Sequence, residues 1–349
     1  MIRFKQNQGK HHFAVVFSFL FLATCQNGPK QELLTFEGQT MGTTYHVKVV
    51  AQRGQPISQT DLQVGIQAQL DRVDQLMSNW KADSEVSHFN AAGTEPVRLG
   101  VETLTVMREA AEIWQQTQGV FDPTLSPLID LWGFGPQKHD AFPTQAEIDL
   151  ARGEIGYDKV VIGENSAQKT NPKLTINLSA IAKGYGVDQV AQYLEAQGLD
   201  RYMVEVGGEM RVLGHNIQNH AWRIGIESPS AATNERTVFA IIERSEGAIA
   251  SSGDYRNHFE HEGKWYSHII NPKTGWPIEP KVAATSVIAD RCSTADALAT
   301  AFMVMAPEDS LALAQKMGVE CLIILRNPES NSLETLYTPR FRSFVLEGL

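Results

Sequence analysis

The sequence contains few cysteines and no motif built from them. Only Cys25, Cys292 and Cys321 occur among its 349 residues. No CxxC pair is present, so nothing points to a zinc site or a thiol-exchange site of that type. If Cys25 is acylated, the other two cysteines could pair only with each other, and the composition therefore predicts no disulfide framework.

Runs of positive charge are also missing beyond the extreme N-terminus. The chain has a net charge of -10, and a nucleic-acid surface requires clustered lysine or arginine, so we expect no nucleic-acid partner. The fingerprints GxGxxG and GxxxxGK[ST] are absent as well. Any nucleotide must therefore be bound by a motif other than these two glycine-rich loops.

No fixed-period repeat, low-complexity segment or Pro/Ser-rich linker occurs after residue 33. Hydrophobic residues make up 42% of the chain, which is enough to bury a large core. Strand-prone and helix-prone segments follow one another without a regular βαβ rhythm, and this favours an α+β fold over a doubly wound sheet. One composite domain over residues 34–349 is the economical interpretation.

The first 24 residues have the pattern of an export signal. Basic residues precede an apolar run over 13–23, which is too short to span a bilayer comfortably but matches the apolar core of a signal peptide. The letters "LAT" before Cys25 resemble a bacterial lipobox, although Thr24 stands where Gly, Ala or Ser is usual. We expect a signal peptide over 1–24 and a lipidated tether over 25–33; a buried N-terminal helix is the alternative.

Local patterns predict the elements that follow. Alternation in "TTYHVKVV" predicts a strand over 43–50. From Leu62 to Met77 the apolar residues fall on one helical face, and Thr60 with Gln63 can form a capping box. Further helices are predicted over 101–117 (ending at Gly119), 180–197 and 293–317, and further strands over 159–163, 173–178, 201–208, 222–228, 237–243, 267–271, 284–289 and 321–326.

Two segments carry candidate ligands for a phosphate and a metal. In "INLSAIAKGYGVD", Ser179 would cap a helix whose free N–H groups attract anions, and Lys183 in its first turn adds positive charge. In "CSTADALATAF", Asp296 and Thr300 lie four apart and offer hard oxygen donors, as Mg²⁺ prefers. The alternatives are an ordinary surface lysine, and an Asp and a Thr that bond their own helix.

The stretch "HIINPKTGWPI" places His268 beside a rigid turn. Pro272 has its φ locked and Gly275 can take a positive φ, so the backbone after the histidine is expected to adopt one conformation. A histidine held in this way can be aimed at a substrate as a base. The alternative is a strand that ends in a turn, with a histidine that only satisfies a neighbour.

Two aromatic segments are candidates for binding loops. "GVFDPTLSPLIDLWGFGP" is rich in Gly, Pro and aromatic residues, and it looks too broken for a helix, so we expect an ordered loop. "SNWKADSEVSHFN" places Trp80 before a polar turn. A tryptophan buried in the core is the alternative for that position.

Taken together, eight motifs between about Thr40 and Met305 resemble the ApbE family, the FAD:protein FMN transferases. The resemblance implies an α+β fold related to the T-fold, in an inner-membrane lipoprotein that faces the periplasm. It also implies cleavage of FAD, attachment of its FMN half to a Thr or Ser hydroxyl through a phosphoester, and release of AMP. The motifs are "TMGTTY", "MSNWKADSEVSHFN", "GVFDPTLSPLIDLWGFGP", "NLSAIAKGYGVD", "VEVGGEMRVLG", "IASSGDYRNHF", "HIINPKTGWP" and "STADALATAF".

The resemblance also assigns roles to residues. His268 would sit at the reacting centre, and Asn177 stands where many members carry Asp, so its contact to FAD changes from acceptor-only to mixed donor and acceptor. The acceptors in the family are subunits of sodium-translocating quinone reductases and related membrane electron-transport complexes. The FAD site would be lined by Met41, Trp80, Val120, Phe121, Asp122, Asn177, Lys183 and Ile270, and Mg²⁺ would be held by the Ala180 carbonyl, Asp296 and Thr300.

Two other functions stay open at this point. An FAD pyrophosphatase would use the same metal with water as the acceptor, and a non-catalytic flavin-binding lipoprotein would need neither step. The presence of His268 with Asp296 and Thr300 argues against the non-catalytic function. The sequence does not separate transferase from hydrolase, because the difference lies in which hydroxyl reaches the phosphorus.

Overall fold

The computed structural model describes residues 31–348, with gaps at 55–56, 136–140, 230–236, 255–257 and 328–329. The predicted signal peptide, Cys25 and the tether up to residue 30 lie outside the described residues. The first strand, β1, already begins at Gln31, so the last three tether positions are part of the fold. Across the described ranges, no helix has both the length and the apolar character needed to cross a membrane.

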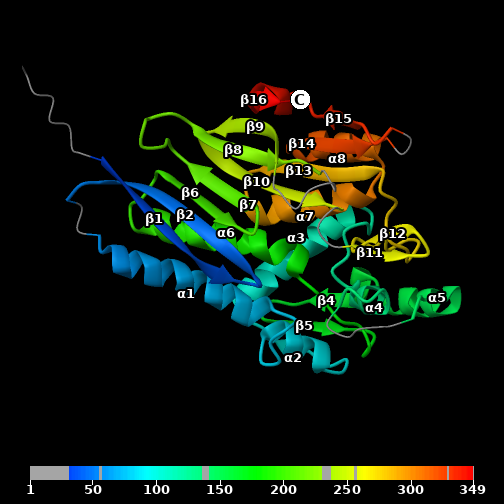
Figure 1. The fold of residues 1–349 in the computed structure, drawn as a ribbon. Helices are drawn as coiled ribbons and strands as arrows, with labels where there is room; N and C mark the ends of the chain where they lie inside the picture. Colours follow the sequence, from blue (N-terminus) through cyan, green and yellow to red (C-terminus); the bar gives the residue numbers. More distant parts are fainter. Residues whose placement is uncertain are drawn as a thin grey trace, which may run out of the picture.

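An eight-stranded antiparallel sheet forms the centre of the described structure (Figure 1). Its second strand confirms the predicted alternation, because Tyr45, Val47 and Val49 are buried while His46 and Lys48 face away. In spatial order the strands are β1 (Gln31–Thr40), β2 (Thr43–Gln52), β6 (Tyr202–Val206), β7 (Glu209–Leu213), β10 (Glu246–Gly253), β13 (Val282–Ala289), β14 (Glu320–Arg326) and β15 (Leu333–Tyr337).

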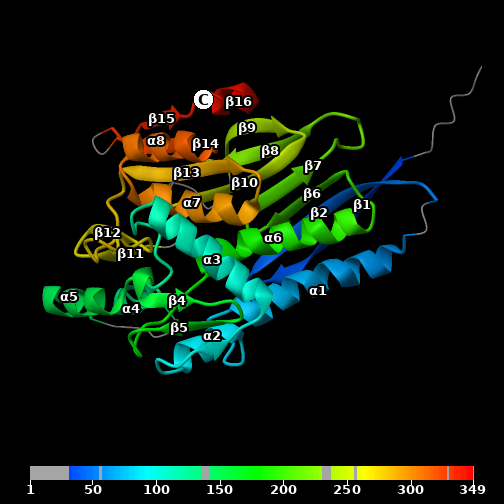
Figure 2. The same ribbon diagram turned by 180° about the vertical axis from the view of Figure 1, so that it is seen from behind.

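Helices cover one face of this sheet (Figure 2). The predicted apolar stripe of the first helix is confirmed, since Leu62, Ile66, Leu70, Val73 and Met77 are all buried. Its start differs from the prediction: the helix is capped by the side chain of the residue before it, which accepts a backbone N–H, and not by a Thr–Gln box. The helices on the sheet are α1 (Gln59–Met77), α6 (Ser179–Ala196), α7 (Cys292–Val304) and α8 (Pro307–Met317), and α3 (Val101–Gln116) packs on α6 and α7.

A smaller sheet packs on part of the opposite face. Ile224 and Ile242 from this sheet share a hydrophobic cluster with Ile249, Ile288 and Leu322 from the central sheet. The apolar side chains therefore alternate toward the layer between the two sheets, as expected for packed antiparallel sheets. The strands, in spatial order, are β16 (Val345–Gly348), β9 (Val238–Arg244) and β8 (Trp222–Glu227).

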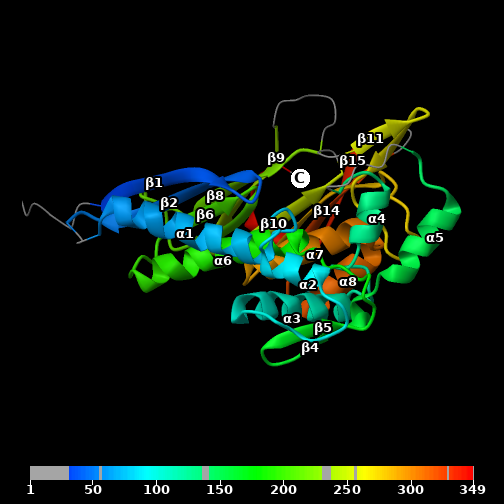
Figure 3. The same cartoon turned by 90° about the horizontal axis from the view of Figure 1, so that it is seen from below.

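A group of short elements gathers at one end of the molecule (Figure 3). Trp132 follows α4 and stacks against Tyr266 of β12, with ring centroids 5.8 Å apart, so this aromatic contact joins α4 to β12. The mixture of antiparallel sheets and helices confirms the α+β class. The short elements are α2 (Glu85–Ala91), β3 (Val97–Arg98), α4 (Ser126–Leu131), α5 (Gln145–Glu154), β4 (Val160–Ile162), β5 (Ser166–Lys169), β11 (His258–His261) and β12 (Lys264–Ser267).

Two predicted strands are wrong. Residues 173–178 form no strand in the described structure. Side chains satisfy their backbone groups instead: Asn90 bonds both the N–H and the carbonyl of Ile176, and Lys169 donates to the Leu174 carbonyl. Of the strand predicted over 267–271, only Ser267 lies in a strand, β12; residues 268–271 lead into the turn that follows and form a single isolated bridge, from Ile270 to Pro277.

Two helix predictions and one loop prediction also need correction. The helix expected over 293–317 is two helices, because Pro307 lacks an N–H and begins α8 as a new helix. Ser179 is the first residue of α6 and not its cap, since Leu178 holds the cap position. The segment expected to be only a loop includes the short helix α4, which the proline at its first turn starts.

The buried stripe of α1 gives a direct test of the fold. Ile66 is 0% exposed, whereas Val64 on the same helix is 63% exposed. Ile66→Ala should lower the free energy of unfolding by about 2–5 kcal/mol, because it leaves a cavity in the core. Val64→Ala is the matched control and should stay within about 0.5 kcal/mol of the parent in urea unfolding. Equal effects of the two changes would contradict the assigned face.

Candidate active site

A cavity of about 1620 Å³ opens between the central sheet and the elements at the end of the molecule. The sequence-based site residues that the structure describes come from segments far apart in the chain, and all of them line this cavity. Cys25 lies outside the described residues. The lining includes Met41, Trp80, Val120, Phe121, Asp122, Asn177, Ala180, Lys183, His268, Ile270, Asp296 and Thr300.

The start of α6 forms one wall of the cavity. Asn177 lies just before this helix, and its side-chain oxygen accepts the Ser179 N–H at 2.9 Å. The backbone N–H of Asn177 donates to the Pro123 carbonyl at 2.7 Å, so the helix start is tied to the segment that contains Asp122. The asparagine thus uses its carbonyl oxygen on the backbone, and its NH₂ group is the part that can donate to a ligand.

Lys183 is not an ordinary surface lysine. Its Nζ lies 3.3 Å from Glu209 Oε1 and 3.5 Å from Asp296 Oδ2. Burial alone would lower the pKa of Lys183, but the carboxylates of Asp296 and Glu209 more than offset this and hold its pKa above the ordinary value. The cavity wall therefore carries a permanent positive charge beside the helix start.

Glu209 is a site residue that the sequence reasoning missed. It is 4% exposed and lines the cavity, and burial raises the pKa of its carboxyl to about 7, although Lys183 opposes this rise. The signal available in the sequence was its place directly after Gly207 and Gly208. Both glycines have positive φ values, so they form a tight turn, and the carboxylate that follows it points toward the cavity.

Asp296 and Thr300 lie one turn apart on α7 and both face the cavity. Asp296 is 3% exposed, so it is a buried position and not a solvent-accessible one. It does not cap its own helix, because Arg291 holds the cap position of α7, and its Oδ2 accepts the N–H of Gly184 in α6 at 3.1 Å. The Thr300 hydroxyl lies 3.3 Å from the hydroxyl of Ser252 on β10.

These groups fit a hard divalent cation. Within the described ranges, no three side chains of the His, Cys, Asp and Glu types gather as a metal site. A cation beside Asp296 would therefore rely on one carboxylate, the Thr300 hydroxyl and a backbone carbonyl such as that of Ala180, since all three line the same cavity. Such a sparse oxygen set suits Mg²⁺, which keeps several waters or phosphate oxygens in its shell.

The turn after His268 is closed by hydrogen bonds, and its glycine has the predicted positive φ. Gly275 has a φ of 76°, and its N–H donates to the Asn271 carbonyl at 2.7 Å. The Gly275 carbonyl accepts the indole N–H of Trp132 at 2.8 Å, so the turn is also tied to the aromatic cluster. The ring of Phe134 meets the His268 ring edge-on, with centroids 6.2 Å apart. The histidine therefore lies at the cavity wall, beside this hydrogen-bonded turn and in edge contact with the Phe134 ring.

Trp80 lies at the mouth of the cavity and is 75% exposed, so the alternative of a buried core tryptophan is wrong. Its backbone N–H donates to the Ser78 hydroxyl at 3.2 Å, which holds the link between α1 and α2. In contrast to the exposed Trp80, two other residues that line the cavity are buried: Phe121 is 3% exposed and Asp122 is 8% exposed. Burial raises the pKa of Asp122, while hydrogen bonds from Thr124 oppose the rise.

Comparison with known proteins adds to this geometry. The model of the ApbE family matches residues 41–323. The FAD:protein FMN transferase of Vibrio cholerae is 44% identical over 314 residues, which cover 89% of this chain and 92% of that protein. The one of Haemophilus influenzae is 39% identical over 314 residues, covering 88% of this chain and 90% of that protein.

Solved structures agree with the sequence comparison. The flavin transferase ApbE from Vibrio cholerae superposes with a TM-score of 0.82 at 41% identity, covering 90% of this chain and 99% of that chain. The apo form of the flavinyl transferase ApbE from Pseudomonas stutzeri also gives a TM-score of 0.82, at 34% identity, with coverage of 91% and 98%. From the family match and these similarities over most of its length, the chain belongs to the ApbE family.

Proposed function

We propose that this chain is a flavin transferase that moves the FMN half of FAD to a Thr or Ser hydroxyl of an acceptor protein, with Mg²⁺ and with AMP as the leaving group. The enzyme class is supported by the relatives, which are named FAD:protein FMN transferases. The observation that carries the chemistry is the cavity, where a positively charged helix start, a hard-oxygen pair and a held histidine meet.

The start of α6 and Lys183 would bind the pyrophosphate of FAD. Helix N-termini attract phosphates through free N–H groups and the helix dipole, and the Lys183 ammonium adds a full charge. Asp296, Thr300 and the Ala180 carbonyl would hold Mg²⁺ beside it. When bound, the metal would neutralise the negative charge that develops on the phosphate oxygens during transfer.

His268 would act as the general base. The acceptor hydroxyl attacks the FMN phosphorus, the phosphorus–oxygen bond to the AMP half breaks, and the histidine takes the proton of the hydroxyl. Thr and Ser hydroxyls are weak nucleophiles without such a base. Histidine suits the task, because its ordinary pKa of about 6.5 leaves it largely neutral at neutral pH.

The flavin end of the substrate would lie against the aromatic and polar wall. Trp80 is exposed at the cavity mouth and can stack on a flat ring system. Met41, Ile270 and the segment Val120–Asp122 line the same cavity. Asn177 would donate a hydrogen bond from its NH₂ group, since its oxygen already accepts from Ser179.

We place the enzyme at the inner membrane, facing the periplasm. The support is the N-terminal pattern: basic residues, an apolar run and Cys25 in a lipobox-like position. An acyl anchor would hold the enzyme beside acceptors in membrane electron-transport complexes of the sodium-translocating quinone reductase type. Stable anchoring requires more than one acyl chain, as a lipoprotein N-terminus provides.

The reaction is tested by mass measurement of an acceptor. The purified protein, FAD, Mg²⁺ and an acceptor subunit of a sodium-translocating quinone reductase are incubated together, and the acceptor should gain the mass of FMN less one water on a Thr or Ser. Free AMP should appear in equal amount. Release of FMN and AMP with an unmodified acceptor would instead identify an FAD pyrophosphatase, and chelation of Mg²⁺ should stop the transfer.

The role of His268 is tested by His268→Asn. General-base catalysis typically contributes about 10²–10⁴-fold, so single-turnover transfer should slow by a factor in that range while FAD affinity persists. His46→Asn is the matched control, because His46 lines the same cavity but pairs with Glu205 at 2.7 Å. Loss of FAD binding together with transfer would make His268 a binding residue, and an unchanged rate would remove it from the mechanism.

The location is tested by Cys25→Ser. Without the thiol there is no site for acylation, so the protein should move from the membrane fraction to the soluble fraction after export. Fractionation and incorporation of a labelled fatty acid are the measurements. A variant that stays membrane-bound and still takes up the lipid label would refute the anchor.

A further inference from the structure

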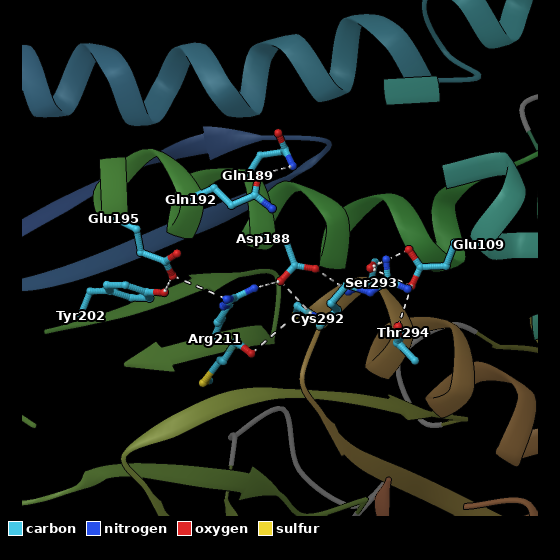
Figure 4. A network of polar contacts seen from close by, with 12 residues as sticks. Glu109, Asp188, Gln189, Gln192, Glu195, Tyr202, Arg211, Cys292, Ser293 and Thr294 are labelled. Atoms are coloured by element: carbon cyan, nitrogen blue, oxygen red, sulfur yellow. Dashed lines mark hydrogen bonds and ion pairs between the residues drawn. The ribbon is translucent and has the colours of Figure 1, made fainter. Parts of the chain in front are cut away.

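The first turn of α7 is held by a carboxylate from another helix. Arg291 precedes α7, and an arginine side chain carries only donors, so it cannot cap the free N–H groups. Asp188 of α6 does so instead: its Oδ1 accepts the Cys292 N–H and its Oδ2 accepts the Ser293 N–H, each at 3.0 Å. Figure 4 shows this carboxylate pointing at the start of α7.

A second carboxylate, from α3, forms hydrogen bonds with the same turn (Figure 4). Glu109 accepts the Ser293 hydroxyl at 3.0 Å and the Thr294 hydroxyl at 2.6 Å, and it lies 3.1 Å from the Arg291 guanidinium. Asp188 and Glu109 are 3% and 5% exposed. Both carboxylates are therefore buried, and each has its charge compensated by donors and an arginine.

The charge on Asp188 is balanced by Arg211 of β7, whose guanidinium lies 2.9 Å from Oδ1. Buried carboxylates are costly unless they are paired and hydrogen-bonded. In this network three elements, α3, α6 and β7, are joined to one turn of α7. Among the described residues that line the cavity, neither Asp188 nor Glu109 appears, so they do not touch a ligand there.

The network nevertheless acts on the site, because Asp296 lies one turn further along α7. There Asp296 Oδ2 accepts the Gly184 N–H of α6 and lies 3.5 Å from Lys183 Nζ. The two helices are thus joined at two levels, one at Asp188 and one at Gly184. A shift of α7 by a single residue would turn Asp296 by about 100° away from α6, since an α-helix has 3.6 residues per turn.

We propose that Asp188 and Glu109 are positioning residues of the transfer site, which hold α7 so that Asp296 and Thr300 face Ala180 of α6 and thereby set the affinity for the divalent cation. This inference rests on the proposed function, in which those three residues hold Mg²⁺. Neither carboxylate carries a role in the sequence-based assignment of the site.

The test measures Mg²⁺ binding directly. Mg²⁺ is titrated calorimetrically into the purified protein with and without saturating FAD, for the parent, Asp188→Asn and Glu109→Gln. Loss of groups that orient metal ligands typically costs about 10–100-fold in metal affinity, so the Mg²⁺ dissociation constant should rise by about tenfold or more. Transfer by both variants should recover at high Mg²⁺, because the cation site is weakened and not removed.

A matched control separates positioning from simple helix stability. Thr144 caps α5 through a capping box with Glu147, and the described residues of α5 do not line the cavity. Thr144→Ala should lower the melting temperature without changing Mg²⁺ affinity. Should Asp188→Asn fail to fold, Glu109→Gln decides by the same criterion, because its contacts are with the side chains of Arg291, Ser293 and Thr294.

The outcomes distinguish the inference from the proposed function. Folded variants that bind Mg²⁺ within twofold of the parent would overturn the positioning role and leave the metal site intact. Asp296→Asn serves as the reference for a lost ligand and should show the largest drop in affinity. A parent protein that binds no Mg²⁺ in either condition, or an Asp296→Asn variant that binds it normally, would overturn the proposed metal role and this inference together.

Discussion

The close contact between α6 and α7 is the constraint on which the rest of the site depends. A Cβ atom on Gly184 would lie 2.3 Å from the Cys292 carbonyl oxygen, so the two helices can approach this closely only with glycine at that position. The contact brings Asp296 of α7 within hydrogen-bond distance of α6 and beside Lys183. The proposed metal ligands and the proposed phosphate-binding helix start are therefore parts of one two-helix unit.

This arrangement places groups that prefer a cation and groups that prefer an anion side by side at the cavity wall. Lys183 is shared between Asp296 and Glu209, so two carboxylates face one ammonium group. The carboxylates favour a cation beside them, whereas the lysine and the helix start favour an anion. A cation together with a phosphate satisfies both preferences, which is why a metal-bound pyrophosphate suits this wall better than either ligand alone.

The histidine is supported by a separate part of the molecule. Trp132 bonds the Gly275 carbonyl of the turn after His268, and it packs with the rings of Phe142, Tyr266 and Trp276. The aromatic cluster thus connects the turn to α4, α5 and the β11–β12 hairpin. The cavity lies between this cluster and the α6–α7 unit, so the proposed base and the proposed metal ligands are held by different packing contacts.

The sequence by itself determined the features that depend on neighbours within a few residues. The buried stripe of α1, the alternation of β2, the turn after His268 and the pairing of Asp296 with Thr300 all follow from helical, strand or turn spacing.

Only the tertiary structure decided the rest. The segment 173–178 is strand-prone in composition, but the side chains of Asn90 and Lys169 take its hydrogen bonds. Glu109 bonds residues more than 180 positions away, and Asp188 bonds residues more than 100 away. No local spacing reports such contacts, because a carboxylate gains its partners only when distant helices pack together.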